Sequence, residues 1–186
     1  INGSELWVTD GTEPGTHIVI NMRADGGGIL YSGSPMALTV YNSKIYFSAG
    51  DDINGQELFM TDGTAGGTIL VKDMFAGAGG SIPYQITIYN GFLYILNSYN
   101  RELWKSDGTS AGTVLVKDIQ VGPEGSDLNA FATVGNRLFF SANDGIHGNE
   151  MWLSDGTAAG TRMVQDIEPG GGSAMESQLY ELKTNI

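Results

Sequence analysis

Apolar and polar residues alternate along short stretches of this chain, and turn-forming residues separate the stretches. Alternation with a period of two, in runs rich in Val, Ile, Tyr, Phe and Thr, predicts β-strands that are half buried. The clearest unit contains the four predicted strands Ala37–Tyr41, Lys44–Ala49, Glu57–Thr61 and Thr68–Asp73. Asn42-Ser43 and Asp62-Gly63 provide the tight turns between them. This unit is therefore predicted to be a four-stranded antiparallel sheet.

One motif, Glu-Leu-Trp followed after two residues by Asp-Gly-Thr, recurs four times, and a Gly-Thr pair follows each copy. The motif aspartates are separated by 52, 45 and 48 residues, and the differences fall in predicted loops. The chain therefore divides into repeats at 1–34 (partial), 35–82, 83–127, 128–176 and 177–186 (partial). A four-stranded unit of this length is typical of a β-propeller blade.

The sequence thus predicts an all-β protein, a β-propeller built of four-stranded antiparallel blades, with residues 1–186 forming one propeller domain or a propeller fragment. Either the four repeats close into a ring, or they form an arc of a larger propeller. All five prolines fall outside the predicted strands, as expected because proline cannot donate to a strand ladder.

Each motif side chain has a predicted structural role. The third-position aromatic is expected to pack between neighbouring sheets, with the preceding Leu or Met packing on the opposite neighbour. The glutamate either belongs to a ring of carboxylates that binds a cation, or accepts backbone N–H groups; the second interpretation is favoured because a buried carboxylate must be satisfied. The aspartate is expected to cap its own turn. These residues are Glu5, Trp7 and Asp10; Glu57, Phe59 and Asp62; Glu102, Trp104 and Asp107; Glu150, Trp152 and Asp155.

Composition narrows the possible partners. The 186 residues include 28 Gly, 21 acidic and 9 basic residues, with a net charge of −12. Nucleic acid is disfavoured as a partner, because binding it depends on Lys and Arg. Cysteine is absent, so thiolate metal sites and disulfides are excluded. No apolar run approaches the length of a membrane helix, so membrane insertion is not expected.

The repeated Glu-Leu-Trp-x-x-Asp-Gly-Thr motif, together with hairpins such as Leu138–Gly145, resembles the bacterial ELWxxDGT-repeat proteins. The resemblance covers nearly the whole chain; Phe59 and the short loop 97–101 depart from it. It implies a propeller-like fold and a secreted or cell-surface location, but it implies no active site.

Functional residues are expected where the repeats differ, since a unique site is not repeated. Two oxygen-rich loops are candidate Ca²⁺ sites, although neither has the spacing of known calcium loops. Tyr31, in an inserted loop, and Tyr99 and Arg101, in the shortened one, are candidates for binding a sugar ring. No catalytic residue is identified. The candidate calcium ligands are Asp51, Asp52, Asn54, Asn143 and Asp144.

These observations lead to a functional hypothesis: a non-enzymatic binding or adhesion module that recognises glycans or surface proteins through its loops. The alternative is a structural repeat unit of an extracellular filament or surface layer, with self-association or further blades from a longer parent chain. A polysaccharide-active enzyme is the third possibility.

Overall fold

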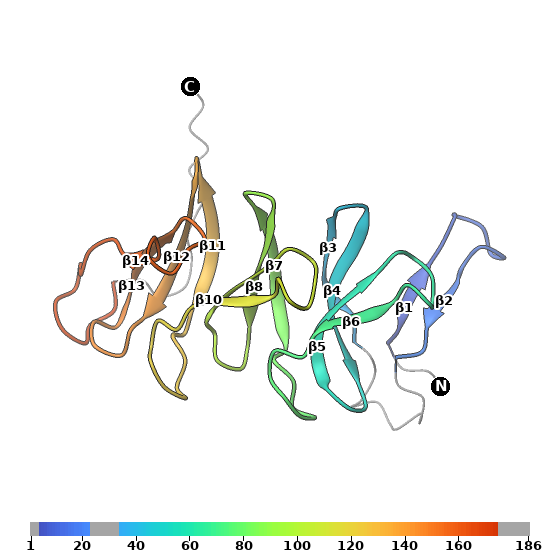
Figure 1. Cartoon of the computed structure of the whole chain (residues 1–186), viewed down its shortest axis with the longest axis horizontal. Helices are drawn as coiled ribbons and strands as arrows, with labels where there is room; N and C mark the ends of the chain where they lie inside the picture. Colours follow the sequence, from blue (N-terminus) through green and yellow to red (C-terminus); the bar gives the residue numbers. More distant parts are fainter. Residues whose placement is uncertain (1–3, 23–33, 175–186) are drawn as a thin grey trace. The chain divides into compact units, whose positions relative to one another are not determined.

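The computed structural model describes residues 4–22 and 34–174, and this part of the chain is all β, as predicted. It forms one two-stranded and three four-stranded sheets, all antiparallel (Figure 1). The first sheet contains β1 (Leu6–Val8) and β2 (His17–Ile20). The second contains β3 (Met36–Tyr41), β4 (Lys44–Asp51), β5 (Gly55–Thr61) and β6 (Ile69–Lys72). The third contains β7 (Pro83–Tyr89), β8 (Phe92–Asn97), β9 (Leu103–Ser106) and β10 (Val114–Lys117). The fourth contains β11 (Asn129–Val134), β12 (Arg137–Asn143), β13 (Asn149–Ser154) and β14 (Arg162–Met163).

Each four-stranded sheet is a simple meander in which strands consecutive in the sequence are neighbours. The four strands predicted in the clearest unit are confirmed, with ends that differ by no more than two residues. Asn42 and Ser43 have φ angles of 48° and 59°, so both central residues of the β3–β4 turn are left-handed. This turn type matches the twist of the strands it joins, which sets the hairpin register.

The prediction that every proline lies outside a strand is wrong for Pro83, which is the first residue of β7. β7 is an edge strand of its sheet. A proline is tolerated at the start of an edge strand because its missing N–H removes no ladder hydrogen bond there.

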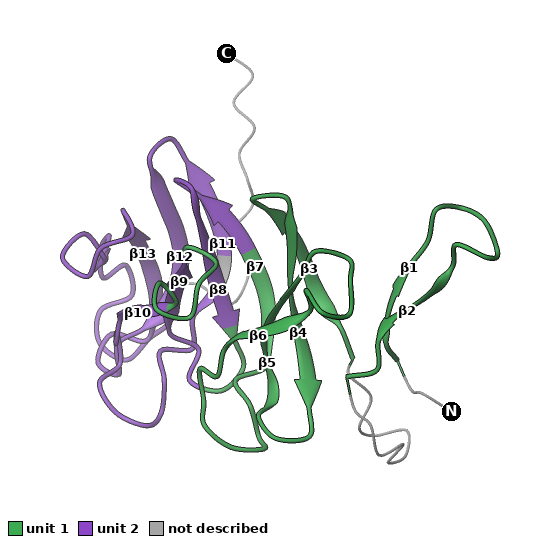
Figure 2. Ribbon diagram, turned by 45° about the vertical axis from the view of Figure 1, so that its right-hand side comes forward, with its two compact units in different colours: residues 1–86, 97–99, 107–113 green, residues 87–96, 100–106, 114–186 purple. Residues whose placement is uncertain are grey.

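The chain separates into two compact units (Figure 2). Unit 1 comprises Ile1–Ile86, Asn97–Tyr99 and Asp107–Thr113, and unit 2 comprises Thr87–Leu96, Asn100–Ser106 and Val114–Ile186. The partial repeat predicted at 177–186 and the candidate Tyr31 lie outside the described residues.

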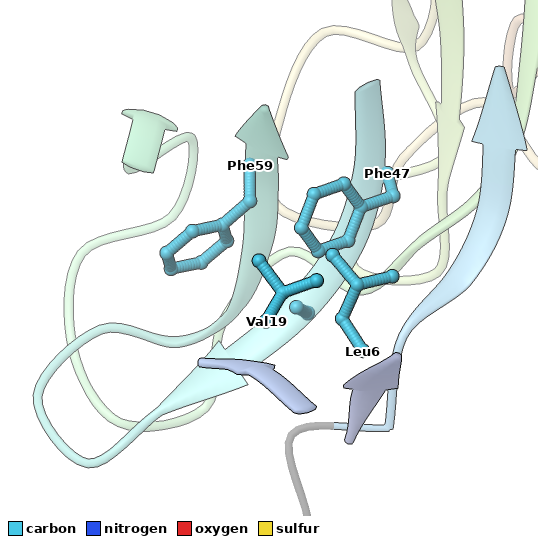
Figure 3. Packing of buried hydrophobic residues seen from close by; sticks show 5 residues of the cluster. Leu6, Val19, Phe47 and Phe59 are labelled. Atoms are coloured by element: carbon cyan, nitrogen blue, oxygen red, sulfur yellow. The ribbon is translucent and has the colours of Figure 1, made fainter. Parts of the chain in front are cut away.

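The core of unit 1 shows how two successive sheets pack. Leu6 and Val19 of the first sheet lie against Phe47, Ala49 and Phe59 of the second (Figure 3). The Phe47 and Phe59 rings are 6.3 Å apart, centre to centre. At this interface Phe59 therefore packs on the preceding sheet and Leu6 packs on the following one, as predicted for these two residues. Burial of such side chains contributes roughly 1.5–3 kcal/mol each.

Trp7 differs from other motif aromatics in its exposure. Its side chain is 57% exposed, whereas Phe59 and Trp152 at the same motif position are 5% and 6% exposed. Trp7 follows Leu6 in β1, so it lies on the face turned away from the β3–β6 sheet. The described residues of unit 1 place no further sheet over that face.

Candidate functional site

The four Asp-Gly-Thr loops share one internal hydrogen-bond pattern, as in the loop that starts at Asp62. The Asp62 Oδ1 accepts hydrogen bonds from the Thr64 N–H at 2.9 Å and the Thr64 hydroxyl at 2.7 Å. The Thr64 hydroxyl in turn accepts the Gly67 N–H, and the Thr68 hydroxyl donates to the Thr64 carbonyl. The hydrogen bond from the Thr64 hydroxyl is the largest of the contributions that lower the pKa of Asp62. The same shift and cause apply to Asp10, Asp107 and Asp155.

This loop also explains the repeated Gly-Thr pair. A Cβ placed on Gly67 would overlap the Asp62 carboxylate, and the same overlap occurs at the equivalent glycine of each copy. The repeated glycine therefore makes room for the capping carboxylate. The motif aspartates cap their turns, as predicted.

The motif glutamates bind backbone amides. Glu57 is fully buried, and its carboxylate accepts the N–H groups of Met74 and Phe75 at 3.1 Å each and of Ser81 at 2.7 Å. The Ser81 hydroxyl donates to the same carboxylate at 2.5 Å. Because Ser81 lies in the segment that leads to β7, this carboxylate fixes the connection between one repeat and the next. The favoured interpretation of the glutamates is confirmed here.

The same arrangement recurs in the other repeats. Glu5 accepts the Met22 N–H, and Glu102 and Glu150 each accept two successive N–H groups after their fourth strands. Burial raises the pKa of Glu57 and raises the pKa of Glu102 to about 7. The oxygens of these carboxylates accept hydrogen bonds from backbone amides of their own repeats.

The two candidate calcium loops have equivalent structures. Asp51 accepts the N–H groups of Ile53 and Asn54 and the side-chain amide of Asn54. Asp144 accepts the N–H groups of Ile146 and His147, and its other oxygen lies 2.8 Å from the His147 Nδ1. The Asn143 side-chain oxygen accepts the Gly145 N–H at 2.7 Å. The side-chain oxygens of Asp51, Asn143 and Asp144 thus accept hydrogen bonds from groups within their own loops.

No cluster of three or more His, Cys, Asp or Glu side chains suited to a metal ion is found in residues 4–22 and 34–174. Asp52 lies exposed next to Asp51 in its loop. The described residues also include no helix long and apolar enough to cross a membrane.

Tyr99 has a partner that the sequence did not reveal. Its ring stacks on Phe75, with the ring centres 3.4 Å apart and an angle of 25° between the planes. Tyr99 is 54% exposed, so more than half of its surface remains open to solvent. The sequence does set Phe75 apart, because the equivalent loops of the third and fourth repeats carry the polar residues Gln120 and Glu168 at this position.

Backbone hydrogen bonds hold both rings of this aromatic pair in place. The Phe75 N–H is bound by Glu57, as described above. The N–H groups of Ser98 and Tyr99 donate to the carbonyl of Ser81 at 3.1 and 3.3 Å. Glu57 and Ser81 thus anchor the segments that carry the two rings, and the pair forms a pre-positioned platform within unit 1.

Arg101, the third candidate for binding a sugar ring, has polar partners of its own. Arg101 belongs to unit 2, where its guanidinium forms an ion pair with Asp127 and its carbonyl accepts the Leu128 N–H. Unit 2 also contains a cavity of about 330 Å³, lined by Asn136, Arg137, Leu153, Asp155, Gly160 and Arg162.

Comparison with known proteins gives only distant similarity. No family model and no curated protein matches the chain. The computationally designed Ika8 protein is 12% identical over 70% of this chain and 35% of its own, with a TM-score of 0.39. The designed Ika4 protein is 13% identical over 79% of this chain and 78% of its own, with a TM-score of 0.43. A glycoside hydrolase is 15% identical over 80% of this chain and 36% of its own, with a TM-score of 0.37. The chain thus spans about a third of the length of the first and third of these proteins, and none of the three similarities assigns it a family or an activity.

Proposed function

We propose that this chain is a non-enzymatic binding module that recognises a glycan through the Phe75–Tyr99 platform. The observation that carries the proposal is an aromatic pair, anchored by backbone hydrogen bonds, with one ring more than half exposed. A solvent-exposed tyrosine that is already held in place loses little conformational freedom when a ligand binds.

The chemistry of the platform fits a sugar ring. An aromatic face offers a flat apolar surface, and the C–H face of a pyranose ring is the apolar side of a sugar, so stacking removes apolar area from water. The tyrosine hydroxyl adds a polar group at the rim. With a net charge of −12, the protein repels anionic polysaccharides, which favours a neutral or amino-sugar glycan.

The non-enzymatic part of the proposal rests on the motif carboxylates. A general acid or base must be available to donate or accept a proton on substrate. The repeated glutamates and aspartates instead accept hydrogen bonds from their own loops and connections, which is the behaviour of a scaffold.

The proposal includes a propeller arrangement, in which successive sheets are blades that stack face to face. Support comes from the core of unit 1, where the motif aromatic of one sheet enters the apolar face of the sheet before it. A secreted or cell-surface location follows from the resemblance of the motif to ELWxxDGT-repeat proteins. Detection of the native protein by immunoblotting of surface and culture fractions tests this location.

Glycan binding is tested on an array of neutral, amino and acidic glycans, followed by calorimetry on the strongest ligand. Tyr99→Ala is expected to weaken binding at least tenfold, as is typical of an aromatic anchor. Phe92→Ala is the matched control, because Phe92 is another exposed aromatic ring, in unit 2, and its removal should leave affinity unchanged. Absence of any ligand, or equal affinity of the Tyr99 variant, would refute the proposal.

A further inference from the structure

Two sheet faces remain uncovered in the described chain, one in each unit. On the first sheet, Trp7 and its cross-strand partner Ile18 share a face on which Trp7 is exposed. On the fourth sheet, Val164 is 42% exposed and lies beside Met151, to whose carbonyl its N–H donates at 2.8 Å. We refer to these as the Trp7 face and the Val164 face.

Both exposures depart from the pattern of the repeats. The equivalents of Trp7 are buried in the second and fourth repeats, and Trp104 in the third is half-buried. The equivalents of Val164 in all other repeats, Val19, Val71 and Val116, are buried. The positions are therefore built as core positions and are exposed only on these two faces. An exposed apolar side chain whose equivalents in the other repeats are buried or half-buried indicates a surface made to be covered.

The core of unit 1 shows how two such faces fit together. There Phe59, the equivalent of Trp7, lies against Leu6 and Val19, which are the equivalents of Met151 and Val164. The Trp7 face and the Val164 face are thus the two halves of an interface that already exists between the first and second sheets. Each half lacks its complement in the described part of its own unit.

Charge supports the same pairing. Arg162 lies opposite Leu153 in the β13–β14 ladder. Arg162, Arg137 and Asp155 line the cavity described above, so two exposed cations and one exposed anion border the Val164 face. On the first sheet, the loop after β1 carries the exposed acids Asp10 and Glu13. Within unit 2, a lysine of one sheet already bonds the motif loop of the next: the Lys105 ammonium donates to the Gly156 carbonyl at 2.7 Å. Arginines of the Val164 face are placed to do the same to a first-sheet loop.

We propose that this chain associates head to tail, with the Trp7 face of one copy docked on the Val164 face of a second copy. The interface is heterologous, because it joins two different surfaces, so it leaves one free face at each end of a dimer. Assembly therefore continues with concentration or closes into a ring. This inference is independent of the glycan site, since it uses neither Phe75 nor Tyr99.

The test is sedimentation velocity of the purified chain over a concentration series from about 1 µM to 500 µM, a range that spans weak protein–protein affinities. The wild-type protein is expected to show mean mass rising with concentration. Trp7→Asp and Val164→Asp, which place a charge in one face each, should raise the dissociation constant about 30-fold or more. Both side chains are exposed, so circular dichroism should show unchanged folding.

A mixture of the two variants gives the decisive result. Trp7→Asp retains a working Val164 face, and Val164→Asp retains a working Trp7 face, so the mixture should form a 1:1 dimer and nothing larger. Val121→Asp is the control, because Val121 is an exposed loop residue outside both faces. This variant should assemble as the wild type does. A wild-type chain that stays monomeric throughout, variants that self-associate normally, or a mixture that stays monomeric would each overturn the proposal.

Discussion

Replacing Glu57 by glutamine removes the charge of a buried carboxylate that accepts several hydrogen bonds. Glu57 accepts three backbone N–H groups and one hydroxyl, and it is fully buried. A glutamine has one carbonyl oxygen, and its amide nitrogen is a donor, so at least one backbone N–H from Met74, Phe75 or Ser81 would face another donor. The substitution keeps the shape of the side chain and changes only its hydrogen bonding.

The expected cost follows from three contributions. A buried donor left unpaired costs about 1–3 kcal/mol, and the loss of hydrogen bonds to a charged acceptor adds about 1.5–3 kcal/mol. Burial raises the pKa of Glu57, so the charged form pays a desolvation cost that glutamine avoids, and this offsets part of the loss. We expect a net destabilisation of about 2–3 kcal/mol at pH 8.

Urea unfolding followed by tryptophan fluorescence measures this difference, and amide hydrogen exchange locates it. Exchange at Met74, Phe75 and Ser81 should accelerate in the Glu57→Gln variant, because the opened amides lose their acceptor. Glu124→Gln is the matched control: Glu124 is exposed, so its stability change should stay within about 0.5 kcal/mol. If Glu57→Gln is as stable as the control and its amides exchange at the wild-type rate, the carboxylate does not anchor this connection.

Two further predictions concern other parts of the repeats. Burial raises the pKa of Glu102 from 4.5 to about 7, so between these pH values the folded chain holds a proton that the unfolded chain has released. The free energy of unfolding should therefore fall by on the order of 2 kcal/mol as the pH rises from 4.5 to 7. Glu102→Gln should flatten this dependence in urea midpoints measured across the range. If the stability of the wild type relative to Glu102→Gln rises with pH over this range, the pKa of Glu102 is not raised in the folded chain. Gly67→Ala should destabilise by about 1–3 kcal/mol in thermal unfolding, because its Cβ would overlap the Asp62 carboxylate, whereas Gly66→Ala, which meets open space, should be neutral or slightly stabilising. Equal effects of the two substitutions would show that the loop has room for a side chain.

Much of the fold was predictable because its signals are local. Asn42 and Ser43 form the turn of the β3–β4 hairpin, and each Asp-Gly-Thr loop closes through hydrogen bonds within seven residues. Periodicity supplied the rest: alternation predicted the strands, and the repeated motif predicted equivalent sheets. The role of the motif glutamates also followed from the sequence, because a repeated carboxylate next to apolar positions has to find donors.

What the sequence determined by itself is therefore the structure of one repeat, since strand alternation, tight turns and capped loops depend on residues close together in the chain. The tertiary structure decided which side chains from distant segments meet. It paired Phe75 with Tyr99, connected Glu57 to Ser81, paired Arg101 with Asp127 and left Trp7 exposed. These outcomes depend on how one sheet stacks on the next, because burial and contact are properties of two packed surfaces and cannot be assigned from either strand alone.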